Sequence, residues 1–184
     1  MKNNILLFAF ILLATTSGLA QKYFTRTAEV GFFSEAPTEN IEAQNRQVTC
    51  ILNTENGELA FSVQLMGFHF EKALMEEHFN ENYVESHKYP KSTFKGKILD
   101  FDKIDLLSAG KHKVIVEGDM FLHGETKTIK ANGELTVAGE EILLSSKFNM
   151  KIEDYKIAIP KAVINKIAES IEVSLMASLT EYKK

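Results

Sequence analysis

The sequence contains a single cysteine, three prolines and no tryptophan among its 184 residues. One cysteine excludes a disulfide within the chain and a metal site built from several thiolates. Basic and acidic residues number 21 and 25, which gives a formal charge of −4, and the basic residues form no cluster. Because nucleic-acid binding depends on clustered Lys and Arg that neutralise phosphates, this charge pattern argues against a nucleic-acid partner.

Residue patterns typical of catalysis or metal binding are also missing from the sequence. No serine lies in a nucleophile-elbow pattern, and no glycine-rich loop leads from a strand into a helix. The histidines are never two or four residues apart, the spacings that place two metal ligands on one face of a strand or helix; they are His69, His78, His87, His112 and His123. The sequence therefore predicts a non-enzyme without metal or cofactor, and we expect His123 on the polar face of a strand.

The N-terminus has the three-part layout of a secretory signal peptide. Lys2 supplies a positive start, an apolar run of ten residues spans 5–14, and small residues lead to Ala20 before Gln21. An uncleaved anchor is the alternative, but a membrane-spanning helix needs about 20 apolar residues. We therefore expect residues 1–20 to be a cleaved signal peptide. Residues 21–184 would form one mature domain, periplasmic or extracellular, without a later transmembrane segment.

Alternation of apolar and polar residues, the pattern of strands with one buried face, dominates the chain from Tyr23 onward. None of the prolines interrupts an alternating run, and the connections are short, with Asn56-Gly57 typical of a tight hairpin. The main apolar sets that share a face are Leu59, Phe61, Val63 and Leu65; Val114, Val116, Met120 and Leu122; Ile129, Ala131, Leu135 and Val137; Ile142, Leu144, Phe148 and Met150; and Ile171, Val173, Leu175 and Leu179.

About eight such strands joined by hairpins predict an all-β fold, a closed eight-stranded antiparallel barrel, with a two-layer sandwich as the alternative. Cys50 is in phase with Val48 and Leu52, so we expect a buried, unreactive thiol. The barrel should carry two short helices where the alternation breaks. The first has the apolar stripe Phe70, Leu74, Met75 and Phe79, and the second begins at Pro160 with Val163, Ile164 and Ile167.

The apolar faces carry the main indication of function. A barrel of about eight strands has room for its own side chains or for one small ligand. Small inward residues could leave a void beside the large ones; they are Gly96, Gly118, Ala131, Gly133, Ser146 and Ala177. The residues predicted to line a ligand site are Phe61, Val63, Phe94, Val116, Met120, Leu135, Leu144, Phe148, Val173 and Leu175.

Few polar groups are expected inside, so the predicted partner is a long-chain lipid. Each buried methylene contributes about 0.8 kcal/mol, so a chain of several isoprene units would bind where a single unit would not. The alternative is a barrel filled by its own side chains, which would make the protein a structural or interaction component of the cell envelope.

Four stretches in order resemble the YceI-like family and cover about residues 22–182. They are residues 78–96 with the Tyr89-Pro90 turn, 118–127 with Gly124-Glu125-Thr126-Lys127, 148–155, and 171–173. The resemblance implies a lipocalin-like barrel, exported in many members, that holds a long isoprenoid or similar amphiphile. It also implies that the first helix lies at a barrel mouth, which makes Leu74 and Phe79 the predicted entrance.

Two positions depart from the pattern common in that family. Glu29 stands where many members have a histidine, and Phe70-Glu71-Lys72 replaces an Arg-Asp pair. The preference for a lipid head group therefore cannot be carried over from the resemblance. The oligomeric state is left open by the sequence, with a dimer among the options.

Overall fold

The structure, a computed structural model, describes residues 22–182, and the predicted signal peptide over 1–20 lies outside the described residues. Two small elements interrupt the strands: β4 (His69–Phe70) and α1 (Ala73–His78), the latter continued by a π-helical turn at Phe79–Tyr83. The long strands are β1 (Lys22–Glu35), β2 (Asn40–Asn53), β3 (Glu58–Gln64), β5 (Lys91–Ile98), β6 (Gly110–Leu122), β7 (Glu125–Ala138), β8 (Glu141–Lys151) and β9 (Ser170–Glu181).

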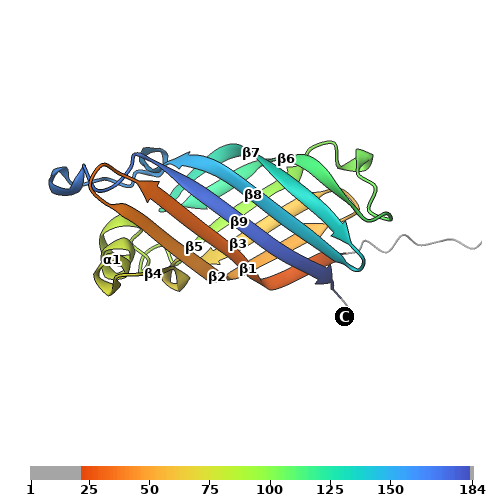
Figure 1. The fold of residues 1–184 in the computed structure, drawn as a ribbon, viewed down its shortest axis with the longest axis horizontal. Helices are drawn as coiled ribbons and strands as arrows, with labels where there is room; N and C mark the ends of the chain where they lie inside the picture. Colours follow the sequence, from red (N-terminus) through yellow and green to blue (C-terminus); the bar gives the residue numbers. More distant parts are fainter. Residues whose placement is uncertain (1–21, 183–184) are drawn as a thin grey trace, which may run out of the picture.

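The eight long strands form one closed antiparallel barrel (Figure 1). They follow the order β1-β9-β8-β7-β6-β5-β3-β2, and β2 pairs back with β1 to close the sheet. The short β4 pairs only with β2, through Ala43↔Phe70 and Gln44↔His69. The structure thus confirms the predicted all-β, eight-stranded antiparallel barrel.

Inward and outward faces follow the predicted alternation because each strand is pleated with period two. Leu59, Phe61 and Val63 are all buried, as are Ile171 and Val173 on β9. Cys50 is fully buried between Val48 and Leu52, and burial raises the pKa of its thiol. The expectation of a buried Cys50 is therefore confirmed.

The alternation slips in β1 and β2, where the register of the pair shifts between Thr25 and Ala28 and again before Val30. An irregular pair leaves backbone groups without ladder partners. Asn45, which is fully buried there, donates from Nδ2 to the Gln64 carbonyl at 2.7 Å and accepts at Oδ1 from the Gln47 amide at 2.8 Å. The Asn45 side chain thus pairs with one backbone group of β2 at the irregularity and with one at the end of β3.

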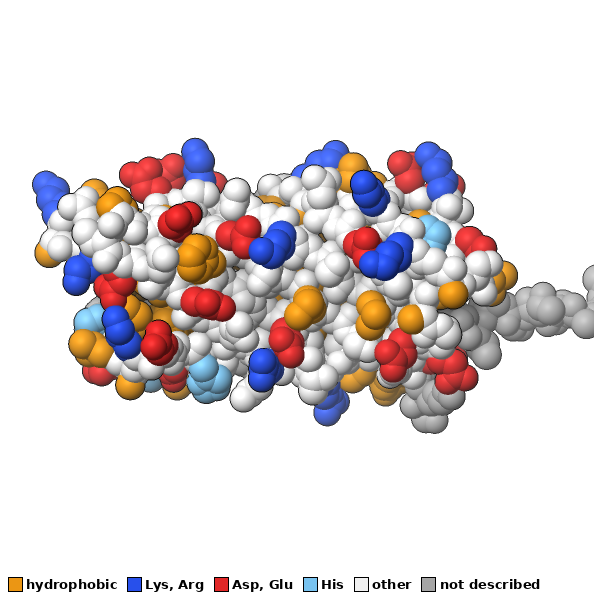
Figure 2. Space-filling view, viewed as in Figure 1, with side chains coloured by type: hydrophobic (Ala, Val, Ile, Leu, Met, Phe, Trp, Pro, Cys, Tyr) orange, Lys and Arg blue, Asp and Glu red, His pale blue; other side chains and the backbone are white. Residues whose placement is uncertain are grey.

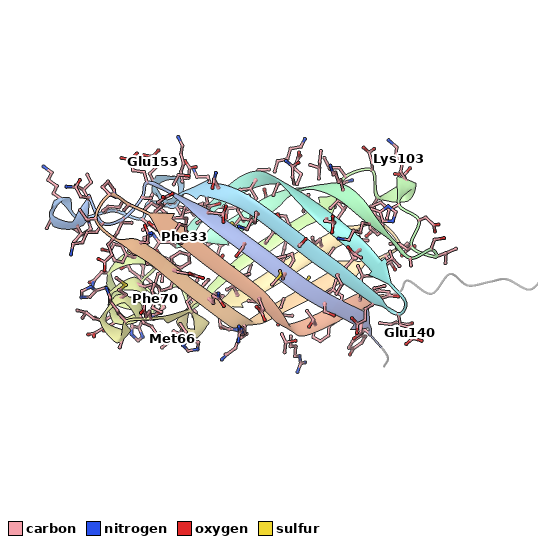
Figure 3. All side chains as sticks on the ribbon, in the orientation of Figure 1. Phe33, Met66, Phe70, Lys103, Glu140 and Glu153 are labelled. Carbon is pink, nitrogen blue, oxygen red and sulfur yellow. The ribbon has the colours of Figure 1, made fainter. Side chains whose placement is uncertain are left out.

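The two ends of the barrel are built differently (Figure 1). One end carries α1 and the segment 152–169, with Met66, Phe70 and Glu153 nearby, and the other carries Lys103 and Glu140 (Figure 3). The Lys103 end is tightly packed, and Phe101, which is 8% exposed, belongs to its buried core. Four side chains there are at most 1% exposed: Leu52, Ile98, Leu135 and Leu179. Any room for a ligand therefore lies toward the end that carries α1.

The second predicted helix is reduced to a single 3-10 turn at Lys161–Val163, after a first one at Ile152–Tyr155. Forming the first helical turn is costly, and the stretch after Pro160 is too short to repay it through further helical hydrogen bonds. Within residues 22–182, no helix has the length and apolar character needed to cross a bilayer.

Candidate binding cavity

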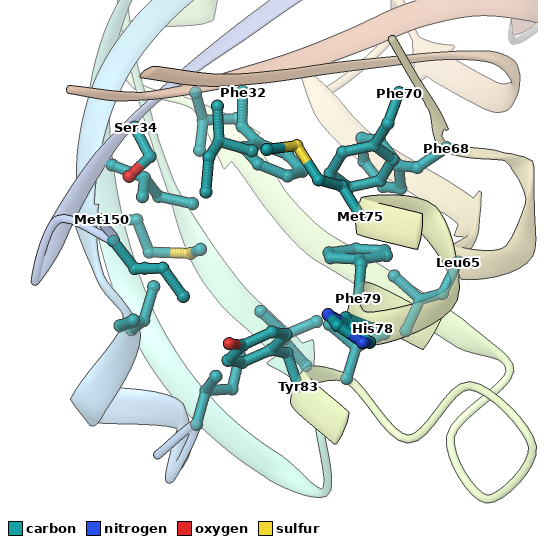
Figure 4. Close-up of a pocket in the computed structure, with 18 of the residues that line it drawn as sticks. Phe32, Ser34, Leu65, Phe68, Phe70, Met75, His78, Phe79, Tyr83 and Met150 are labelled. Atoms are coloured by element: carbon teal, nitrogen blue, oxygen red, sulfur yellow. The ribbon is translucent and has the colours of Figure 1, made fainter. Parts of the chain in front are cut away.

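An apolar cavity of about 440 Å³ opens at the α1 end of the barrel (Figure 4). Strands β1, β8 and β9 supply one wall, with Phe32, Met150 and Val173. The segment 65–84 supplies the other, with Leu65, Phe68 and Phe79. This volume lies within the range of small-molecule pockets, which are mostly apolar with a few polar groups.

A smaller void of about 110 Å³ continues toward the middle of the barrel. Both spaces are lined by the same belt of residues, namely Val30, Val63, Ser92, Met120 and Val173. Ser92, the one polar member of the belt, donates its hydroxyl proton to the Phe121 carbonyl at 2.8 Å. Together the two spaces form an elongated apolar interior that ends at the packed half of the barrel.

The structure brings nearly all the predicted lining residues to these two spaces. Val63, Met120 and Val173 line both, and Leu74 and Phe79 of the predicted entrance line the larger one. Leu135 instead lies in the packed half, fully buried. Six residues line the smaller space alone: Phe61, Phe94, Val116, Leu144, Phe148 and Leu175.

The small inward residues contribute less to the void than the sequence indicated. Gly96 and Gly118 face each other across β5 and β6, and a Cβ on Gly96 would lie 2.6 Å from the Cα of Gly118 and 2.7 Å from the Phe94 ring. The close approach of the two strands therefore occupies the space that the missing side chains would otherwise leave. Ala131, Gly133 and Ser146 do line the smaller space.

A cluster of four aromatic rings lies at the cavity beneath α1, formed by Phe32, Phe68, Phe70 and Phe79 (Figure 4). The Phe79 ring lies 5.6 Å from Phe32, 5.4 Å from Phe68 and 5.2 Å from Phe70. No residue of Ala73–His78 is buried, and Leu74 is 61% exposed. The cover is therefore held mainly by Phe79 and its neighbours, and only weakly by α1.

Charged and polar side chains gather at the mouth of the cavity. Lys72 Nζ lies 2.7 Å from Glu39 Oε1, and Lys166 Nζ lies 4.0 Å from the other carboxylate oxygen. The hydrogen bond from Lys72 holds the pKa of Glu39 below its usual value, and burial raises the pKa of Tyr83, another lining residue. The mouth thus offers two ammonium groups, one carboxylate and a neutral phenol to a ligand.

His123 does not lie on the polar face of a strand, as the sequence analysis expected. It lies with Gly124 in the tight β6–β7 turn, where both residues have positive φ, and its ring is largely buried. Nδ1 is 2.9 Å from the Tyr155 carbonyl and Nε2 is 2.9 Å from Glu85 Oε2, with the Tyr89 ring against its edge. His123 therefore joins three connections beside the cavity, a tertiary role that strand periodicity does not reveal.

Within residues 22–182, no three His, Cys, Asp or Glu side chains are grouped to hold a metal.

Several residues of the cavity were not identified from the sequence. Phe32 stands beside another phenylalanine, Phe33, so the pattern there does not say which of the two faces inward. Glu39 and Lys166 lie far apart in the chain and meet only because the β1–β2 turn and the segment 152–169 share one end of the barrel. Periodicity could not have found this charged group.

The model of the YceI-like domain family matches residues 24–179. No curated protein matches the chain.

Solved structures share the fold at low sequence identity. A polyisoprenoid-binding domain from Saccharophagus degradans, implicated in plant cell wall breakdown, is 15% identical, with a TM-score of 0.76 over 88% of this chain and 98% of that one. BcnA of Burkholderia cenocepacia is 13% identical, with a TM-score of 0.68 over 83% and 96%. The YceI protein of Campylobacter jejuni is 16% identical, with a TM-score of 0.64 over 82% and 90%.

Proposed function

The chain belongs to the YceI-like domain family, and we propose that it is an exported protein whose barrel binds a long isoprenoid-like or other amphiphilic lipid. The observation that carries the proposal is the elongated apolar cavity with its charged mouth. The polyisoprenoid-binding domain of Saccharophagus degradans, which shares the fold, supports the choice of ligand class. An apolar wall with its polar groups at the opening favours binding over catalysis.

The distribution of polar groups orients the proposed ligand. The hydrocarbon chain would lie along the belt formed by Val30, Val63, Met120 and Val173, where the wall is apolar. A polar head would remain at the mouth, within reach of Lys72 and the other polar side chains there. This arrangement keeps the head group hydrated and avoids the cost of burying it unpaired.

The direct test is to identify what the purified protein carries. Native mass spectrometry should show a complex heavier than the polypeptide, and organic extraction should release a reproducible hydrocarbon-rich molecule. Protein stripped of this molecule should then take up a fluorescent polyprenyl probe. A polypeptide without any passenger that also fails to take up the probe would contradict the proposal.

Filling the belt between the two spaces should weaken binding. A phenylalanine in place of Val173 would occupy room otherwise taken by two or three ligand methylenes, each worth about 0.8 kcal/mol, so we expect affinity for the polyprenyl probe to fall about 15- to 60-fold. The matched control is Met176→Phe on the outer face of the same strand, where the side chain is 59% exposed. Equal affinities of the two folded variants would show that the chain does not lie along this belt.

The alternative, a structural or interaction protein with a filled barrel, is favoured by one observation, the solid packing around Leu52, Ile98, Leu135 and Leu179. That packing occupies only the end away from α1. Two measurements separate these functions. A protein with a filled barrel would carry no bound lipid, and its Val173→Phe variant would show no loss of affinity for the probe.

Export has its own test. The signal peptide proposed for residues 1–20 should be absent from protein recovered outside the cytoplasm, so its intact mass and N-terminal sequence should begin at Gln21. Replacing two leucines of the apolar run, Leu6 and Leu7, by aspartate should leave uncleaved protein inside the cell. For the unaltered sequence, recovery of full-length chain outside the cytoplasm would contradict cleavage, and retention of the full-length chain inside the cytoplasm would contradict export.

A further inference from the structure

The segment 158–168 at the cavity mouth has an unusual composition for an exposed stretch. Eight of its eleven residues are apolar, and its only charged residues are Lys161 and Lys166. Ile164 is 52% exposed, and Pro160 and Ala162 are also exposed. In a chain with an acidic balance overall, this stretch contains no carboxylate side chain.

The same segment contributes to the wall of the cavity. Val163, Lys166 and Ile167 line the larger space, whereas Ile164 and Lys161 are exposed to solvent. Its position is fixed by contacts to the end of β1 and to the β1–β2 connection: the Ala168 amide donates to Ser34 Oγ at 2.8 Å, and Thr38 Oγ1 donates to the Asn165 carbonyl at 2.8 Å. The exposed apolar residues are thus held in place beside the opening.

The segment also projects beyond the rest of the barrel (Figure 1), and its tip shows apolar and basic side chains without acidic ones (Figure 2). Two further apolar side chains are exposed at the same end, Met66 at 59% and Leu74 at 61%. The nearby α1 carries Glu76 and Glu77, whereas the projecting segment carries Lys161 and Lys166 without a carboxylate side chain of its own. This composition suits contact with a lipid bilayer, which has a hydrocarbon interior, when its head groups are anionic.

We propose that the segment 158–168 docks the cavity mouth on a lipid bilayer that contains anionic phospholipids. Ile164 and its apolar neighbours enter the boundary between head groups and acyl chains, while Lys161 and Lys166 contact phosphates. The cavity then opens toward the bilayer, and a hydrocarbon chain passes between the two without crossing water. This inference rests on the proposed lipid-binding function, since it names the surface that supplies or receives the ligand.

Vesicle flotation of the purified mature chain tests the proposal, with phosphatidylcholine vesicles prepared with and without phosphatidylglycerol. We expect binding that is stronger with phosphatidylglycerol, and a loss of about tenfold in Ile164→Asp, which puts a carboxylate where the segment enters the bilayer. Lys161→Glu should remove only the added effect of phosphatidylglycerol. The matched control is Leu107→Asp, because Leu107 is 99% exposed at the opposite end of the barrel.

Three outcomes would overturn the docking surface: no binding to either vesicle, equal losses in Ile164→Asp and Leu107→Asp, or a dimer that Ile164→Asp converts to monomer without any vesicle binding. The last would assign the segment to a second copy of the chain. Uptake of the polyprenyl probe from vesicle-free solution is measured in parallel. Probe uptake without vesicle binding would overturn docking alone, whereas absence of probe uptake would overturn the proposed function.

Discussion

Replacing Leu135 by alanine should lower the free energy of unfolding by about 2–5 kcal/mol, whereas the same truncation at Met120 should cost less than half as much. Leu135 is fully buried in the packed half, in register between His112 and Leu144. Removing it leaves a hole that its neighbours can fill only in part. Met120 lines both spaces of the cavity, so its side chain already lacks packing partners on one side and has fewer contacts to lose.

Urea unfolding followed by circular dichroism measures both effects, and an unchanged dependence on urea concentration would show that the truncations alter stability alone. For binding of the polyprenyl probe, the two positions should exchange importance. Leu135→Ala should leave the affinity unchanged, whereas Met120→Ala should alter it. Equal stability losses at the two positions would contradict the division of the barrel into a packed half and a hollow half.

The barrel itself could be predicted from the sequence because pleated strands impose a period of two. Sets such as Leu59, Phe61 and Val63 keep one phase over a whole strand, and the side chains fall where that phase puts them. The period fails where two strands are irregular together. At Asn45 the register shift moves the inward face from odd to even positions, as Ala43 and Val48 show.

The division into packed and hollow halves could not be read from the sequence, because residue size does not report where strands approach each other. Gly96 and Gly118 suggested a void, yet they allow β5 and β6 to come close, and Phe94 covers them. Leu135 and Leu144 occupy neighbouring strands in one register, but only Leu144 borders a space. What separates them is burial, since Leu135 is fully enclosed and Leu144 is 6% exposed.

The mouth was the least predictable part, because its groups come from connections. The first apolar stripe indicated a helix, and α1 does form over Ala73–His78, but Phe70 of that stripe lies in β4 and Phe79 follows the helix. Neither the π-helical turn that positions Phe79 nor the contact of Lys72 with Glu39 follows from helical spacing. The stretch after Pro160 has a helical stripe but remains a 3-10 turn, held by tertiary hydrogen bonds such as that from Thr38.

Phe79 anchors the cover of the cavity, so Phe79→Ala should make uptake and release of a polyprenyl probe faster. Of the rings that Phe79 contacts, Phe68 and Phe70 belong to the cover itself, and only Phe32 lies on the barrel wall. An aromatic contact contributes about 0.5–1.5 kcal/mol, so loss of the contact with Phe32 would lower the cost of opening by that amount. That range corresponds to rates about 2- to 13-fold faster. Opening would break no long-strand pairing, since β4 adds only two residue pairs at the edge of β2.

Stopped-flow fluorescence measures these rates, and circular dichroism should show the β-type spectrum retained. Leu74→Ala is the matched control on the same cover, because Leu74 is 61% exposed, and it should change the rates little; combining the two substitutions should add little to Phe79→Ala alone. If a folded Phe79→Ala protein exchanges the probe at the original rate, the segment 65–84 is a fixed plug. The ligand must then enter beneath the segment 152–169, and disrupting the Thr38 contact to Asn165 should accelerate exchange instead.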